Sequence, residues 1–84
     1  MPLELEFHQE PVSALAYQHH GDRLVSGACD GSVALWMPTQ HQRPIEIRGF
    51  GDEITGLSWL PNDDAFALGT LGGEVASVRA RRFA

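Results

Sequence analysis

The sequence predicts an all-β protein built from two copies of one unit, and three observations support this. Short apolar segments alternate with turn residues along the 84-residue chain, which contains nine Gly and five Pro. No segment keeps the helical spacing of apolar residues over three turns. The chain also repeats itself at a shift of 42 residues, so that its length makes two whole periods.

The repeat is seen in paired positions. Under the 42-residue shift, Pro2-Leu3-Glu4-Leu5 falls on Pro44-Ile45-Glu46-Ile47 without a gap. The same shift pairs similar or identical residues further along the chain: Val12 with Ile54, Leu15 with Leu57, Tyr17 with Trp59, Asp22 with Asp64, Gly27 with Gly69, and Gly31 with Gly73. Because Tyr17 and Trp59 share one position of the repeat, both are interpreted as core residues.

Each period is predicted to hold four short strands. Leu3, Leu5 and Phe7 alternate with Glu4 and Glu6, the pattern of a strand with one wet face. Residues 11–17 are apolar on both faces, which predicts a strand covered on both sides. The remaining strands are expected at 23–28, 32–37, 44–48, 53–60, 65–70 and 74–79. Between them, Asp30-Gly31 predicts a type I′ hairpin turn, in which both residues have positive φ, and further turns are expected at Asn62-Asp63 and Gly72-Gly73.

Composition excludes several classes of function. The net charge is −5 and all six positive residues are Arg. Because an acidic chain repels phosphate backbones, general nucleic-acid binding is not expected. No basic amphipathic helix and no apolar run of about 18 residues is present, so membrane binding is not expected either. The single cysteine, Cys29, predicts a reducing, cytoplasmic location and is interpreted as a small half-buried residue beside the turn.

One ordered series of motifs carries a resemblance to a known family. The series is Phe7-His8, Pro11-Val12, Leu15-Ala16-Tyr17, Gly21-Asp22, Leu24-Val25-Ser26-Gly27, Asp30-Gly31-Ser32-Val33 and Leu35-Trp36. It resembles the repeat of the WD-repeat β-propeller family, whose period is about 40–45 residues. Met37 stands where that family usually has Asp. The second repeat is similar mainly by position.

The resemblance implies two four-stranded antiparallel propeller blades. Repeat 1 then covers residues 1–42 and repeat 2 residues 43–84, with the strand order d-a-b-c in each, where d is the outermost strand of a blade. It also implies a buried hydrogen-bonded network of His8, Ser26, Asp30 and Trp36. In that network the Asp carboxylate accepts from the imidazole, the imidazole bonds the hydroxyl, and the hydroxyl accepts from the indole. The second repeat has Phe50, Leu68, Gly72 and Val78 at these positions.

Two groups of residues allow a chemical interpretation as well. Ser26, His8 and Asp30 are the residue types of a hydrolase triad, but a nucleophilic serine must be exposed beside an oxyanion hole. His19, His20 and His41 are possible metal ligands, although adjacent histidines in a turn usually point apart. The structural interpretation is favoured in both cases, so no catalytic residue, cofactor or metal is expected.

Two blades cannot close a ring, because propellers have about 4–8 blades. The expected solution is a closed β-propeller formed by homo-oligomerisation, with a tetramer of eight blades favoured over a trimer of six. In this scheme residues 2–6 form the outer strand of another copy's second blade, beside residues 74–79. The expected oligomer interface comprises Leu3, Leu5, Val75 and Val78.

The function expected from these observations is that of a non-catalytic scaffold, a ring that presents a rigid face to a protein partner. Two alternatives stay open. The chain can be a C-terminal or engineered fragment of a longer WD-repeat propeller without activity of its own. The centre of the ring can also hold a small-ligand or enzymatic site.

Overall fold

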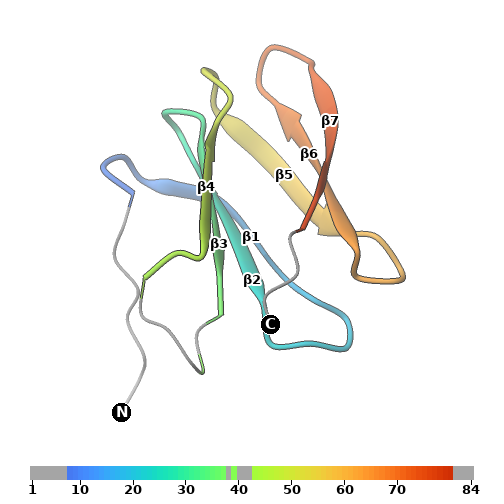
Figure 1. Ribbon diagram of the computed structural model, residues 1–84. Helices are drawn as coiled ribbons and strands as arrows, with labels where there is room; N and C mark the ends of the chain where they lie inside the picture. The colour runs from blue at the N-terminus through green and yellow to red at the C-terminus, as the bar shows by residue number, and fades with distance from the viewer. Residues whose placement is uncertain (1–7, 38, 40–42, 81–84) are drawn as a thin grey trace.

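The computed structural model describes residues 8–37, 39 and 43–80, which form seven strands. The strands are β1 (Val12–Tyr17), β2 (Leu24–Ala28), β3 (Ser32–Trp36), β4 (Glu46–Gly49), β5 (Ile54–Trp59), β6 (Ala65–Thr70) and β7 (Val75–Arg79). β1-β2-β3-β4 make one antiparallel sheet, called sheet A, and β5-β6-β7 make another, called sheet B (Figure 1). The predicted all-β class is confirmed.

The sheets are offset from the sequence repeats. β4 belongs to repeat 2, yet it pairs with β3 of repeat 1, with Val33 opposite Arg48 and Ala34 opposite Ile47. The outermost strand of sheet A therefore comes from the second repeat. In the described part of the chain, sheet B has three strands and β7 has a neighbour on one side. The predicted strand at residues 2–6 lies outside the described residues.

The β2–β3 hairpin turns at the predicted position, but the predicted turn type is wrong. Gly31 donates its N–H to the Ala28 carbonyl at 3.1 Å and has a φ of 86°. Among the described non-glycine residues, positive φ occurs at Asp63 alone, so Asp30 does not have the conformation that a type I′ turn requires. The loop is instead a three-residue hairpin connection, a turn followed by a left-handed glycine. The β6–β7 loop repeats it, with Gly73 at a φ of 95°.

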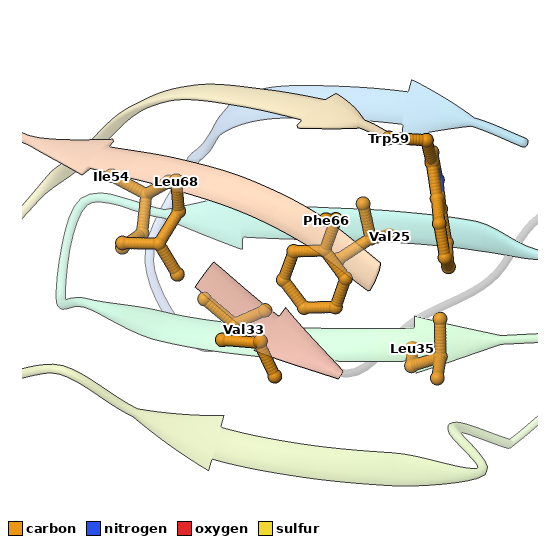
Figure 2. Packing of buried hydrophobic residues seen from close by; sticks show 8 residues of the cluster. Val25, Val33, Leu35, Ile54, Trp59, Phe66 and Leu68 are labelled. Carbon is orange, nitrogen blue, oxygen red and sulfur yellow. The ribbon is translucent and has the colours of Figure 1, made fainter. Parts of the chain in front are cut away.

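The main core lies between the two sheets. Sheet A contributes Val25, Val33 and Leu35, and sheet B contributes Ile54, Trp59, Phe66, Leu68 and Val78 (Figure 2). Trp59 meets the ring of Phe66 edge-on, with the ring centroids 5.4 Å apart. The Trp59 indole also donates to the Ala16 carbonyl at 3.0 Å, which ties β5 to β1. We call the two faces in contact here the inner faces of the sheets and the opposite faces their outer faces.

The two sheets approach each other most closely at β1, β2 and β5. A Cβ atom added at Gly27 would lie 2.7 Å from Cβ of Ile54, so glycine is needed there for the close packing. A small apolar pocket lies between the sheets on the side of β4 and β7, and it is lined by Val33, Leu35, Arg48, Phe66 and Val78. The two sheets therefore pack most tightly at β1 and β5, and a small unfilled pocket remains between them toward β4 and β7.

The outer face of sheet A is exposed along β1 and β4, whereas Leu24, Ala34 and Trp36 on β2 and β3 are buried. Tyr17 is 66% exposed whereas Trp59, at the same position of the repeat, is 3% exposed. The prediction that Tyr17 is a core residue is wrong for the described chain, because no described sheet covers the outer face of β1. Residues 11–17, expected to be covered on both sides, likewise pack on one side through Ala14 and Ala16. Within the described residues, no helix is long and apolar enough to span a membrane.

Candidate functional site: a hydrogen-bonded network on sheet A

A hydrogen-bonded network lies on the outer face of sheet A. Ser26 on β2 and Trp36 on β3 are brought together by the register of these strands, which places Ser26 opposite Ala34 and Leu24 opposite Trp36. The turn that joins the two strands supplies Asp30, and Ser32 begins β3. His8 comes from the segment before β1. The antiparallel hairpin thus gathers side chains that are up to 28 residues apart in the sequence.

The contacts form one continuous chain. The Trp36 indole N–H donates to Ser26 Oγ at 2.8 Å, and Ser26 Oγ lies 2.7 Å from His8 Nε2. His8 Nδ1 lies 2.7 Å from Ser32 Oγ, and the Ser32 hydroxyl donates to Asp30 Oδ1 at 2.6 Å. Asp30 Oδ1 also accepts the backbone N–H of Ser32 at 3.0 Å. The Asp30 carboxylate therefore stabilises the β2–β3 turn and also ends this series of hydrogen bonds.

The donors and acceptors assign the form of the imidazole. Because the Ser32 proton points to the carboxylate, Ser32 Oγ is free to accept, and His8 Nδ1–H donates to it. His8 Nε2 is then an acceptor and receives the proton of Ser26, whose oxygen accepts from Trp36. Every proton in the chain has one acceptor when His8 is neutral with its proton on Nδ1. A protonated His8 would leave the Ser26 hydroxyl facing a second donor.

The electrostatics agree with this assignment. Burial lowers the pKa of His8 below its ordinary value of 6.5, although the nearby charge of Asp30 opposes that shift. The hydrogen bonds from the side chain and backbone of Ser32 lower the pKa of Asp30. Near pH 7 the network therefore contains a neutral imidazole and an ionised carboxylate.

The structure brings the four expected residues together and adds Ser32. The resemblance implied a direct bond from imidazole to carboxylate, whereas His8 Nδ1 is linked to Asp30 through the Ser32 hydroxyl. The sequence did contain a signal for this link, since Ser two residues after an Asp in a turn often shares that carboxylate. Ser26 and Trp36 are 3% and 2% exposed, and no buried polar side-chain atom of the described residues lacks a hydrogen-bond partner.

Comparison with known proteins agrees with this geometry. The family pattern called "WD domain, G-beta repeat" matches residues 2–37, the segment that holds the whole network. The chain belongs to the WD40 repeat family. It is 36% identical over 66 residues to Mediator of RNA polymerase II transcription subunit 16 of Xenopus laevis, covering 73% of this chain and 10% of that protein. A WD repeat-containing protein of Dictyostelium discoideum is 29% identical over 76 residues, covering 75% of this chain and 13% of that protein.

Solved structures similar to this WD40 chain include two computationally designed proteins. The Ika4 protein superposes with a TM-score of 0.77 at 29% identity, covering 89% of this chain and 44% of that one. The Ika8 protein gives a TM-score of 0.78 at 28% identity, covering 90% of this chain and 23% of that one. This chain therefore spans less than half of either design and about a tenth of the two curated relatives.

The second 42-residue repeat has apolar packing in place of the network. Phe50, Leu68 and Val78, at the positions of His8, Ser26 and Trp36, belong to or pack against the inter-sheet core. The β6–β7 turn is held differently from its counterpart: Gly72 donates its backbone N–H to Asp52 Oδ2 at 2.7 Å. Asp52 lies in the loop before β5, a position that the sequence did not single out.

The catalytic and metal-binding interpretations find no geometry to support them. Ser26 is buried, and its oxygen is occupied by Trp36 and His8, so a substrate carbonyl cannot reach it in this arrangement. His19 Nε2 lies 3.1 Å from the Trp59 carbonyl oxygen, and His41 lies outside the described residues. Within the described ranges, no three potential metal-ligating side chains gather. WD40 proteins are generally non-catalytic scaffolds.

The residues predicted at the oligomer interface and at the turn differ in their exposure. Val75 on β7 is 83% exposed, whereas Val78 is 9% exposed and already packs in the core of this chain. Leu3 and Leu5 lie outside the described residues. Cys29 is exposed, so its interpretation as half-buried is wrong: the hairpin loop turns it toward solvent.

Proposed function

We propose that this chain is a non-catalytic WD40 scaffold whose two blades assemble with other copies into a closed β-propeller. The assembled ring would present its loops as a rigid surface to a protein partner. Four copies, giving eight blades, are favoured over three copies, giving six. One observation carries this proposal: each sheet has one face packed inside the chain and one face that lacks a partner sheet among the described residues.

The outer face of sheet A carries exposed apolar residues that a partner sheet would cover. Val12, Leu15 and Tyr17 on β1 and Ile47 on β4 are between 49% and 66% exposed, and all lie on one side of the sheet. Val12, Leu15 and Tyr17 follow one another along β1, and an exposed apolar strip of this kind is a feature of interaction sites. A second blade packed there would bury it as sheet B buries the inner face.

The edge of sheet B supports an exchange of strands between copies. In sheet A, β4 pairs with β3 so that Ile47 lies opposite Ala34 and Arg48 opposite Val33. Shifting this register by 42 residues places Leu5 of a second copy opposite Ala76 of β7. Leu3 would then lie beside Val78. Ala76 and Val78 face the inter-sheet core, so both leucines would point toward the small apolar pocket between the sheets.

The order of the strands along the chain also supports this exchange of strands. β4 completes sheet A and leads directly into β5 of the next sheet. Residues 2–6 of a second copy would complete sheet B in the same way and lead into that copy's β1. An additional strand on β7 would also cover an open sheet edge, which otherwise invites aggregation.

A second candidate is that these two blades act as part of a longer WD40 chain. The comparisons favour this possibility through coverage, because the match occupies 10% of the Xenopus laevis protein and 13% of the Dictyostelium discoideum protein. In that case the outer faces would be covered by other blades of one polypeptide, and this segment alone would stay monomeric.

Light scattering with mass determination distinguishes the candidates. The chain of 9.2 kDa is expected to give a single species of four or three times that mass. The strand exchange is tested by Leu3→Glu with Leu5→Glu, which places charges on the side expected to face the pocket. The matched control is Glu4→Gln with Glu6→Gln, on the opposite side of the same predicted strand.

The first pair of changes is expected to abolish the assembly and the second to preserve it. A folded monomer of the unmodified chain at micromolar concentration would reject assembly from identical copies. Equal behaviour of the two double variants would reject the strand exchange.

A further inference from the structure

The 42-residue repeat gives the outer face of sheet A a counterpart inside the molecule. Its exposed residues Val12, Leu15 and Tyr17 correspond to Ile54, Leu57 and Trp59. These three lie on the inner face of sheet B and pack against sheet A. Ile54 is fully buried whereas Val12 is 49% exposed. The same kind of surface therefore occurs twice in the described chain, once covered and once uncovered.

The surface that receives Ile54, Leu57 and Trp59 is also repeated. It includes Ala14, Ala16, Val25 and Gly27 on the inner face of sheet A, and the residues that correspond to them are Gly56, Ser58, Ala67 and Gly69. The strand register places these four on the outer face of sheet B, since their neighbours Leu57 and Leu68 face the core. All four have small side chains or none. The outer face of sheet B is thus shaped to receive a surface like that of β5.

Gly69 gives the clearest sign of an absent partner. At Gly27, an added Cβ would lie 2.6 Å from Ile54 Cγ2 and 2.7 Å from Ile54 Cβ, so the packing of β5 requires glycine there. At Gly69, an added Cβ would meet only Thr55 Oγ1 at 3.8 Å and the Glu74 carbonyl oxygen at 3.9 Å, which are ordinary contacts. Its φ is not positive either. Nothing within the described chain requires glycine at this position.

The Ser13 hydroxyl makes two contacts, and its counterpart Thr55 makes one of the two. Ser13 Oγ lies 2.5 Å from the Ile54 carbonyl oxygen and 3.4 Å from the Gly27 carbonyl oxygen. The corresponding Thr55 Oγ1 makes the second of these contacts, to the Gly69 carbonyl oxygen at 3.2 Å. The counterpart of the first acceptor is the carbonyl of Val12. The exposed Thr55 hydroxyl is therefore placed to donate to Val12 of a second copy.

From these correspondences we infer that a second copy docks head-to-tail, its β1 face of Val12, Leu15 and Tyr17 seated on the Gly56, Ser58, Ala67 and Gly69 face of sheet B. This inference rests on the proposed function and names the surfaces that meet in it. Because the two patches differ, the contact is heterologous, and it forms a ring when the rotation between successive copies closes. Val12 lies against Gly69 in this interface, and the absence of a Cβ at Gly69 leaves room for the close approach of Val12.

One part of the internal interface has no counterpart between copies. Asp63 accepts the backbone N–H groups of His19 and His20 at 2.9 and 2.8 Å, which joins the loops of the two sheets. The residues that correspond to His19 and Asp63 are Pro61, which has no N–H, and Gly21, which has no carboxylate. The interface between copies therefore depends on the sheet faces rather than on this loop contact.

Two glycine substitutions test the docking. Gly69→Ala is expected to leave the protomer folded and to prevent assembly, because its Cβ would collide with Val12 of the next copy. Gly56→Ala is the matched control, since an added Cβ there meets no atom within 4 Å and the corresponding residue Ala14 already carries one in the internal interface. Mass is measured by light scattering and folding by circular dichroism.

Tyr17 provides a readout that does not depend on a variant. It is the only tyrosine in the chain, and docking would bury it as Trp59 is buried. Nitration by tetranitromethane is expected to be slow in the assembled chain and at least about tenfold faster in Gly69→Ala or in the chain diluted to the monomer. This readout decides the matter even if Gly69→Ala fails to fold.

The possible results separate the two proposals. Assembly with a protected Tyr17, lost in Gly69→Ala and kept in Gly56→Ala, supports the docking. Assembly in which Tyr17 stays reactive, or which survives Gly69→Ala, overturns the docking and leaves the strand exchange standing. Assembly that survives the changes at Leu3 and Leu5 but not Gly69→Ala overturns the strand exchange alone. A folded monomer of the unmodified chain overturns both.

Discussion

At the scale of single residues, the network on sheet A shows how a polar cluster can occupy a buried position. Ser26 Oγ accepts from Trp36 and donates to His8, so neither buried partner is left without a hydrogen bond. A network with one member missing is worse than apolar packing. The second repeat fits this rule, because Phe50, Leu68 and Val78 replace the network members together.

The Ser26–Trp36 contact is expected to stabilise the fold measurably. Trp36→Phe and Ser26→Ala should each lower the free energy of unfolding by about 1–3 kcal/mol, because each removes the hydrogen bond between the buried indole and the buried hydroxyl. The double variant should lose less than the sum of the two, since both changes remove the same contact. Urea unfolding followed by circular dichroism measures all three. Gln9→Ala, at an exposed position before β1, is the control and should change the free energy by less than about 0.5 kcal/mol.

A pH dependence follows from the neutral state of His8. Its pKa is lowered in the folded protein by burial, so below about pH 6.5 the unfolded chain binds more protons than the folded one. The stabilisation that comes from a neutral His8 is therefore fully present above about pH 6.5. It is lost as the pH falls toward the pKa of His8 in the folded protein. The urea midpoint should therefore drop between about pH 7.5 and pH 5.5. Asp30, with its own pKa lowered, contributes only at more acidic pH.

His8→Gln tests the origin of this dependence. Glutamine retains a donor and an acceptor but does not titrate. The variant should show a smaller change of the urea midpoint over the same pH interval. An unchanged slope would assign the pH dependence to other groups and contradict a neutral His8 as its cause.

At the scale of elements, the sequence predicted more about the strands than about their connections. Alternation and the repeat located β1 to β7 to within about two residues at most ends, because strand patterning depends on local residue order. The hairpin at Asp30-Gly31 was predicted at the right place but with the wrong turn type, since the same residues suit two- and three-residue loops. The bond of Ser32 to Asp30 has a local signal, but its place in the network was missed because that depends on the contact with His8, 24 residues away.

Asp63 is the loop residue that connects the two sheets. Although burial would raise the pKa of Asp63, the backbone N–H groups of His19 and His20 lower it overall, and its φ is 60°. Asp63→Ala should reduce the urea midpoint, because two loop N–H groups lose their acceptor and alanine disfavours this left-handed backbone. Asp64→Ala is the control, as that exposed carboxylate accepts from the neighbouring Asn62 side chain within the same loop. Equal effects of the two variants would show that the loop contact contributes nothing.

At the scale of the whole molecule, the burial of the two repeats differs more than their sequences do. Tyr17 and Trp59 occupy the same position, yet one is exposed and the other buried. The sequence specifies an apolar side chain at both positions. Whether that side chain is buried depends on whether another sheet packs against its face. For β5 that neighbour is sheet A of the same chain. For β1 we assign it to another copy, and no pattern within one repeat could have revealed the difference.

The proposed assembly would make stability depend on protein concentration. Because copies would bind one another only when folded, the unfolding temperature should rise as the protein concentration is raised from about 1 to about 100 μM. Tyr17→Lys should remove this rise, since a charge on the outer face of sheet A would be buried without a partner. Leu71→Lys is the control: Leu71 is 68% exposed and lies in the β6–β7 loop, outside the strands that form the two docking faces, so the rise should persist. An unfolding temperature of the unmodified chain that does not change with concentration would contradict assembly, and a rise that survives Tyr17→Lys would place the contact elsewhere.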